Sequence, residues 1–411
     1  MENIERARPG FIALYAIGYV GAYVALITPV ATTLALKVGE LDPEGKETSL
    51  GLIAALGALM AIVSNALSGA LSDRTRSGLG RRRPWIIWGA AGGVVALAIV
   101  GFAPTLLIAT IGWLLAQLTL NMVLAALQAL LPDQVPLEQR ARASAVLGIS
   151  QQVSPLLGIG IAYGVQAAGG GIGLMFLVPA VVGAIMLGIL VARIRDVPHE
   201  SAGTFSFREF VAGFSIAKGK RYDFGWAWFG RFFVILGFAV YTTYQVYFIA
   251  DRLGVSGPDV VLMQLYALLI FSAVLTASAI VSGRISDRTG RRKPFVFAAA
   301  AIVGVGLTML ALTNSLPFFF LAAAVMGVGI GAFFAVDLAL ITDVLPDREH
   351  QAAKDLGIFN IANSLPQSVA PAIAPLFLAI GGGGNYTALF IAGGVFSVIG
   401  ALLIAPIRAV K

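Results

Sequence analysis

Two charged side chains lie inside long apolar stretches of the chain. Asp337 is the only acidic residue deep in such a stretch, and Arg231 lies in another. A charge in lipid costs about 2.5–3.5 kcal/mol on insertion scales, so each is expected to face a partner or a water-filled space. At about 1.5 Å per residue, Asp337 lies roughly 13 Å and Arg231 roughly 9 Å from helix ends on the same side, which allows an ion pair. A static pair, or an Arg231 that reaches the membrane surface, is the alternative.

This pair of charges could exchange a proton. Apolar surroundings favour the neutral form of a carboxylic acid, whereas a neighbouring guanidinium favours the carboxylate. Both histidines of the chain lie in polar loops. Asp337 with Arg231 is therefore the candidate for coupling to protons.

Amide and aromatic side chains form polar faces on other apolar stretches. Spacings of three and four residues place them on one helix face. Amides donate and accept hydrogen bonds and aromatic rings cover the apolar faces of sugars, so the set suits a neutral polyhydroxy solute. Amides also join helices by bonds worth about 0.6–2 kcal/mol, and this structural role is the alternative. The candidate binding residues are Asn65, Gln117, Asn121, Gln151, Gln152, Tyr241, Tyr244, Gln245, Asn360, Asn363 and Gln367.

A charged loop occurs twice. The sequence SDRT at 72–75 recurs at 286–289, and GRRRP at 80–84 recurs as GRRKP at 290–294. We expect Asp73 and Asp287 to pair with arginines at the cytoplasmic ends of the helices. These pairs would hold the cytoplasmic side of the protein shut when it faces outward. The alternative is that these loops only set the topology. The gating candidates are Asp73, Arg74, Arg81, Arg82, Asp287, Arg288, Arg291 and Arg292.

The elements that position these residues follow from composition. Of 411 residues 58% are hydrophobic and 12% are charged, against about 25% charged in soluble domains, so lipid must be the solvent for most of the surface. The chain is predicted to be an all-α polytopic membrane protein with twelve transmembrane helices. The apolar stretches run over 11–36, 49–71, 85–103, 105–131, 143–168, 172–192, 225–250, 260–283, 295–313, 318–342, 356–380 and 386–407.

The cations set the expected orientation. With twelve spans, 24 of the 28 lysines and arginines lie on the side of the two termini. The positive-inside rule then predicts a multi-pass protein of the cell membrane with both termini in the cytoplasm. This distribution explains the net charge of +7 without a nucleic-acid partner. Cysteine is absent, and the sequence contains neither a phosphate-binding loop nor a nucleophile–base set. We therefore expect no enzymatic activity, no cofactor and no metal site. We also expect the protein to be a monomer.

The repeat extends beyond the charged loops. At an offset of about 210 residues, Asp133 aligns with Asp343 and Pro136 with Pro346. One six-helix unit has been duplicated, which predicts two pseudo-symmetric bundles, 1–194 and 225–411, around a binding site at mid-membrane. The segment 195–224 is predicted to be a cytoplasmic linker. Its residues 207–214 either form a short helix on the membrane or a flexible tether.

These loops resemble a known signature. The pattern Gly-x-x-x-Asp-Arg followed by Gly-Arg-Arg, at 69–74 with 80–82 and at 283–288 with 290–292, resembles that of the major facilitator superfamily over the whole chain. The loop TRSGLGRRRPW at 75–85 is similar to that of the glycoside-pentoside-hexuronide and sucrose-type sugar symporters. Sodium-coupled members carry acids where Asn65 and Asn121 stand, and sucrose-type members carry an acid near Gln117. The resemblance therefore implies a substrate class but not an ion-coupling chemistry.

The resemblance and the residues together give an expectation for function. We expect a secondary active transporter that moves a small polar solute, a sugar or a sugar-like compound, by alternating access and with a proton. The alternative is an efflux pump for amphipathic compounds, because the superfamily contains both and the fold does not decide.

Overall fold

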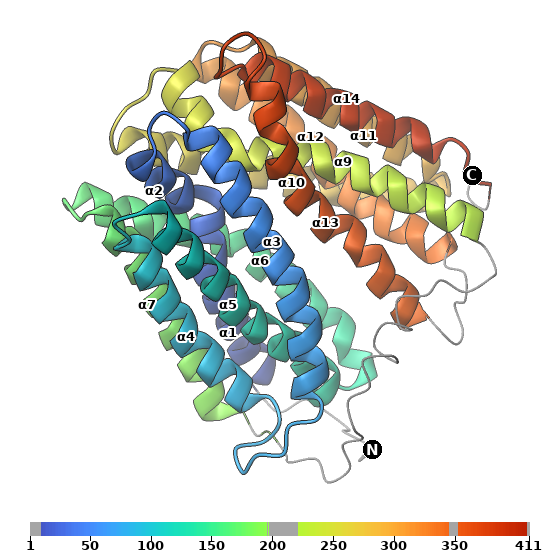
Figure 1. Ribbon diagram of the computed structural model, residues 1–411. Coiled ribbons are helices and arrows are strands. Elements are labelled where there is room, and N and C mark those ends of the chain that lie inside the picture. The colour runs from blue at the N-terminus through green and yellow to red at the C-terminus, as the bar shows by residue number, and fades with distance from the viewer. Residues whose placement is uncertain (1–9, 195, 197–220, 345–351, 409–411) are drawn as a thin grey trace. The chain divides into compact units, whose positions relative to one another are not determined.

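The computed structural model describes residues 10–194, 196, 221–344 and 352–408. The described residues form helices and connecting loops (Figure 1). In the first half these are α1 (Phe11–Thr28), the π-helix η1 (Pro29–Thr33), α2 (Leu34–Leu41), α3 (Lys46–Ser72), α4 (Arg83–Gly101), α5 (Leu106–Gln134), α6 (Leu137–Ala167) and α7 (Ile172–Arg193). In the second half they are α9 (Arg221–Tyr247), the π-helix η2 (Phe248–Arg252), α10 (Asp259–Thr289), α11 (Lys293–Leu312), α12 (Leu316–Val344), α13 (Ala352–Leu378) and α14 (Tyr386–Ile404).

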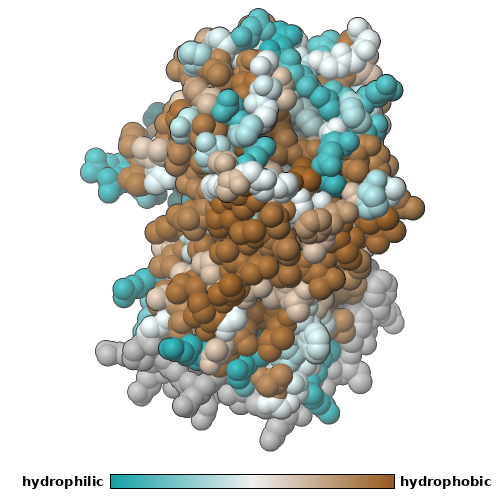
Figure 2. All heavy atoms as spheres, turned by 90° about the vertical axis from the view of Figure 1, so that its left-hand side faces the viewer, coloured by the Kyte–Doolittle hydropathy of each residue, from teal (hydrophilic) through white to brown (hydrophobic). Residues whose placement is uncertain are grey.

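These helices confirm the predicted membrane fold. With α1–η1–α2 and α9–η2 each taken as one helix, the described parts of the chain contain twelve long helices. Eleven of them are long and apolar enough to cross a membrane. The remaining helix, α13, contains prolines 366, 371 and 375 and three amides. On the face shown in Figure 2, a broad hydrophobic area lies between more hydrophilic ends, as expected for a surface that meets lipid.

Local signals explain where several helices begin. The side chains of Thr105 and Asn385 accept hydrogen bonds from backbone amides in the first turns of α5 and α14, as N-cap residues do. The repeated charged loops each contain a glycine with positive φ, 97° at Gly80 and 61° at Gly290. Only glycine adopts this backbone conformation without strain, which explains why the loop keeps a glycine in both copies.

The chain divides into two compact units, Met1–Phe205 and Ser206–Lys411. Within the first unit α1 packs on α6 and α7, α3 on α5, and α4 on α5 and α7. Within the second unit α9 packs on α13 and α14, α10 on α12, and α11 on α12 and α14. The packing pattern is therefore the same in both units, as a duplication requires. The bundle boundaries at 194 and 225 stay a prediction, and the segment 207–214 lies outside the described residues.

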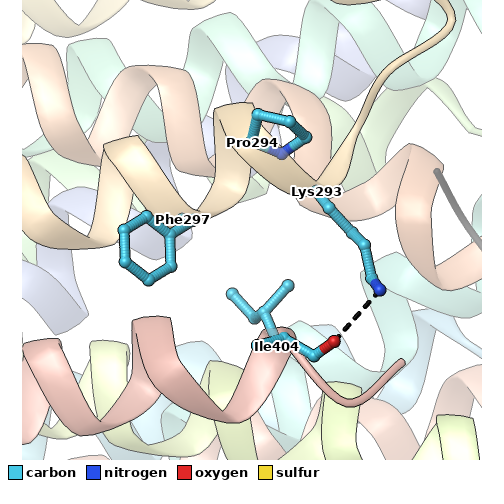
Figure 3. A pocket seen from close by; sticks show the side chains of 5 residues that line it. Lys293, Pro294, Phe297 and Ile404 are labelled. Atoms are coloured by element: carbon cyan, nitrogen blue, oxygen red, sulfur yellow. Dashed lines mark hydrogen bonds between the residues drawn. The ribbon is translucent and has the colours of Figure 1, made fainter. Parts of the chain in front are cut away.

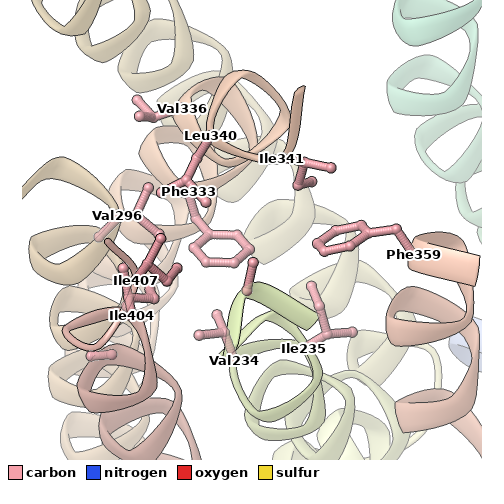
Figure 4. Close-up of a cluster of buried hydrophobic side chains, with 14 of the residues drawn as sticks. Val234, Ile235, Val296, Phe333, Val336, Leu340, Ile341, Phe359, Ile404 and Ile407 are labelled. Carbon is pink, nitrogen blue, oxygen red and sulfur yellow. The ribbon is translucent and has the colours of Figure 1, made fainter. Parts of the chain in front are cut away.

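A hydrophobic cluster joins α9, α11, α12, α13 and α14 of the second unit (Figure 4). Val234 from α9, Val296 from α11, Phe333 from α12 and Ile404 from α14 are each at most 3% exposed. Such a densely packed interior gives its side chains little freedom to move. It also fixes α9 against α12, the two helices that carry Arg231 and Asp337.

Candidate functional site

The structure brings Arg231 and Asp337 together within the second unit. The Nη1 group of Arg231 on α9 donates to the carboxylate of Asp337 on α12, and its Nε donates to Oδ1 of Asn363 on α13 over 3.1 Å. The side chains of Arg231 and Asp337 are 10% and 4% exposed. The contact between two charges on different spans is thus a feature of the fold, and Asn363 joins it.

Aromatic rings complete the surroundings of Arg231. Its guanidinium carbon lies 5.8 Å from the ring centre of Phe334 and 5.2 Å from that of Phe359. Both distances are typical of cation–π contacts. Arg231 is therefore held by groups from α12 and α13 that do not depend on the charge of Asp337. Such an arrangement can keep the arginine in place while the carboxyl group gains or loses a proton.

The other polar residues of α13 remain accessible. Asn360 and Gln367 are exposed, and Nε2 of Gln367 donates to the backbone oxygen of Asn363 over 3.2 Å. These two amides share one face of α13 with Asn363, as the spacing predicts. They extend the Arg231 cluster along the helix with exposed amide groups.

The candidates on α9 lie in the interior instead. Tyr241, Tyr244 and Gln245 are 4%, 0% and 7% exposed. The ring of Tyr241 lies against Phe390, with centroids 6.4 Å apart. The hydroxyl of Tyr244 donates to the backbone oxygen of Pro371 over 3.4 Å. In this conformation the two tyrosines shape the packing of α9 and are not accessible to a solute.

In the first unit, Gln117 and Asn121 on α5 bond to each other. The Asn121 side chain donates to Oε1 of Gln117 over 3.0 Å and to its backbone oxygen over 2.8 Å, and both residues are buried. Asn65 on α3 is half-buried. Gln152 on α6 has a buried Nε2 with no hydrogen-bond partner among the described residues.

A tyrosine ladder on α1 escaped the sequence reasoning. Tyr15, Tyr19 and Tyr23 follow each other at intervals of four, and the rings of Tyr19 and Tyr23 are stacked with centroids 5.1 Å apart. The Tyr15 hydroxyl donates to the backbone oxygen of Leu127 on α5 over 2.7 Å. The exposed Gln151 of α6 donates to the Tyr23 hydroxyl over 3.3 Å. The four-residue spacing was a visible signal, because it places tyrosines on one helix face.

Arg82 is the centre of a charged network at one end of the first unit. Its guanidinium donates to the carboxylates of Asp73 and Asp133, and Arg81 donates to Asp133 as well. The side chain of Arg82 is only 3% exposed. The Asp196 carboxylate accepts from the backbone amides of Arg82 and Arg83 at the start of α4, where an acid is favourable. No sequence pattern pointed to Asp196, which becomes a partner only when α7 ends beside α4.

The second copy of the loop differs. Asp287, Arg288 and Arg291 are exposed, and Asp287 forms no ion pair with a residue that the structure describes. The side chain of Asp343, which corresponds to Asp133, lies outside the described part of the chain. The expected pairing is thus seen for Asp73 and Arg82 only. Arg74 donates to the backbone oxygen of Ala70 over 2.7 Å.

Comparisons with known proteins place this geometry in a family. Residues 10–273 and 227–410 match the sequence profile of the Major Facilitator Superfamily. A general alpha-glucoside permease of Schizosaccharomyces pombe is 30% identical over 123 residues, which span 26% of this chain and 22% of the permease.

Solved transporter structures share the fold. A peptide transporter POT in complex with sulfate gives a TM-score of 0.75 at 13% identity, with coverage of 97% of this chain and 94% of that one. The nucleoside transporter NupG also gives 0.75 at 13% identity, with coverage of 97% and 99%. A bacterial homologue of the human lysosomal transporter Spinster gives 0.72 at 15% identity, with coverage of 96% and 95%. The chain is a multi-pass membrane transporter and belongs to the major facilitator superfamily.

Proposed function

We propose that this protein moves a sugar or a sugar-like solute across the cell membrane by alternating access, and that a proton is transported with it. The cluster of Arg231, Asp337 and Asn363, in which Asp337 is buried, carries the proposal. A charged pair inside apolar helices is expensive to keep and typically belongs to an ion or substrate pathway. The protein acts as a monomer with both termini in the cytoplasm.

Asp337 is the proton carrier in this proposal. When the carboxylate is paired with Arg231, it is stabilised in its charged form. A conformational change that separates the two side chains leaves the carboxyl group in drier surroundings, which favour protonation. Asn363 and the rings of Phe334 and Phe359 hold Arg231 meanwhile. One proton is thus loaded and released in each cycle.

A neutral polyhydroxy solute fits the accessible polar groups. Gln151 and Tyr23 offer an amide and a hydroxyl beside an aromatic ring in the first unit. Asn360 and Gln367 offer amides in the second. Aromatic faces cover the apolar side of a sugar ring while amides bond its hydroxyls. The partial match to an alpha-glucoside permease points to the same substrate class.

The test is uptake of radiolabelled maltose and sucrose into proteoliposomes with an imposed proton gradient. We expect wild-type protein to concentrate at least one of these glucosides. Asp337→Asn is expected to abolish accumulation against the gradient and to retain part of the exchange of internal for external solute. Glu44→Gln removes an exposed carboxylate between α2 and α3 and serves as the matched control with unchanged accumulation.

Three outcomes contradict the proposal. An Asp337→Asn variant that still concentrates solute would show that the proton is carried elsewhere. Wild-type accumulation that does not change with the proton gradient would exclude proton coupling. Failure of both sugars, together with proton-driven movement of a cationic dye, would favour the efflux pump for amphipathic compounds.

A further inference from the structure

A small pocket opens between the beginning of α11 and the end of α14 (Figure 3). It has a volume of about 290 Å³ and is lined by Lys293, Pro294, Phe297, Ile404 and Ala405. In Figure 3, the ring of Phe297 and the side chain of Ile404 border the open space, with the Lys293 ammonium at its edge. The pocket lies within the second unit, and none of its lining residues contacts Arg231 in the hydrogen bonds or ring contacts given above.

Charge at the pocket is positive on one side. The Lys293 Nζ donates to the backbone oxygen of Ala405 over 3.1 Å. This bond satisfies a carbonyl at the end of α14 and fixes the ammonium at the pocket. The first turn of α11 adds the positive end of its helix dipole, and Lys293 offsets the negative end of the α14 dipole. Arg291, two residues before Lys293, is exposed at the same end of α11.

Apolar surface continues from the pocket along both helices. On α14, Leu402, Val398 and Val395 are 57%, 45% and 50% exposed, and their spacing of three and four residues places them on the face of Ala405. On α11, Phe297 and Val305 are 43% and 55% exposed. Both helices are long enough to cross a membrane, so these exposed side chains lie at the depth of acyl chains.

We propose that the pocket binds one anionic phospholipid of the bilayer. Its phosphate lies against Lys293 and the first turn of α11, and one acyl chain follows the apolar faces of α11 and α14. Basic pockets between membrane helices are suited to such headgroups. A zwitterionic lipid carries the same chains but no net negative charge, so it is held less tightly. Four of the five lining residues are apolar, so the pocket itself suits the start of an acyl chain, with the phosphate at the Lys293 edge.

The test measures lipid binding to the purified full-length protein in neutral detergent by native mass spectrometry. Phosphatidylglycerol is the probe, and phosphatidylcholine with the same chains is the comparison. Lys293→Gln is expected to weaken phosphatidylglycerol binding about fivefold, because one lysine near an anionic headgroup contributes roughly 1 kcal/mol. Lys293→Arg keeps the charge and is expected to bind nearly as tightly as wild type. Arg284→Gln removes an exposed cation on α10 and is the matched control, with a change below about twofold.

A blocking variant tests the pocket independently of charge. Ala405 is exposed at the end of α14, so Ala405→Phe fills the space without disturbing the core and is expected to lower binding as Lys293→Gln does. Melting temperatures in lipid-free detergent confirm that each variant is folded. Equal binding of phosphatidylglycerol by wild type, Lys293→Gln and Ala405→Phe would overturn the proposal. Equal binding of the two lipids would overturn it as well. So would inorganic phosphate alone, if it raised the melting temperature as much as phosphatidylglycerol does.

Discussion

Removing the cation from the Arg231–Asp337 pair should destabilise the second unit strongly. Arg231→Gln leaves the Asp337 carboxylate, whose side chain is 4% exposed, without its positive partner. Breaking a buried ion pair in this way costs about 3–5 kcal/mol. The variant also loses the bond to Asn363 and two ring contacts, each ring contact being worth about 0.5–1 kcal/mol.

A double-mutant cycle separates these contributions. Asp337→Asn alone removes the charge but leaves Arg231 with Asn363 and the rings, and we expect a loss of about 1–3 kcal/mol. In the double variant no buried charge is left unpaired, so its loss should be smaller than the sum of the single losses by about 1.5–3 kcal/mol. The contributions of Asn363 and the rings cancel, because they are lost in both variants that lack Arg231.

The assay is unfolding of the purified protein in mixed micelles of increasing sodium dodecyl sulfate content, followed by tryptophan fluorescence. The same cycle on Lys37 and Glu40 is the control. These side chains lie 3.6 Å apart and are 5% and 54% exposed, so solvent at Glu40 should keep their coupling below that of the doubly buried Arg231–Asp337 pair. Additive losses would refute the reasoning, that is, a double variant whose loss of stability equals the sum of the losses in Arg231→Gln and Asp337→Asn.

Two further predictions concern the charged network and the orientation. Asp133 accepts from two arginines and is 20% exposed, whereas Asp73 accepts from Arg82 and is 55% exposed. Asp133→Asn should therefore increase cytoplasmic labelling of a reporter cysteine and slow transport more than Asp73→Asn, and equal effects would contradict a gating role for the network. A cysteine in place of Glu44 should react with an impermeant maleimide in intact cells. Labelling only after lysis would show that the predicted orientation is wrong. The native chain has no cysteine, so no other residue gives background labelling.

The sequence predicted the helices well because lipid imposes a simple rule on composition. The stretch predicted at 172–192 is the helix Ile172–Arg193, and the one at 295–313 is Lys293–Leu312. The pairing of Arg231 with Asp337 was predictable for the same reason, since each charge needed a partner inside an apolar region. Spacing alone did not separate accessible amides from packed ones. Tyr244 and Gln367 both lie on polar faces, yet only Gln367 is exposed.

Contacts between distant segments were harder to foresee. Tyr23 was missed because a tyrosine in an apolar helix is compatible with lipid, core or ligand contact, and only the position of Gln151 on α6 distinguishes them. Asp196 was missed because its role depends on α7 ending next to the first turn of α4. Both residues act through tertiary neighbours that the local sequence does not encode.

The duplication shows where the chemistry of the two units diverges. At the offset of 210 that aligns Asp133 with Asp343, Asp337 corresponds to Leu127. In the first unit, α1 and α5 are joined at this position by the Tyr15 hydroxyl and the Leu127 backbone oxygen. In the second unit, the equivalent helices α9 and α12 are joined by Arg231 and Asp337. Both copies therefore tie the same helix pair at the same level, but a tyrosine–carbonyl bond has no carboxylate to titrate. Among the described residues at this level, only the second unit has a carboxylate, so the proton carrier that we propose lies there and has no counterpart in the first unit.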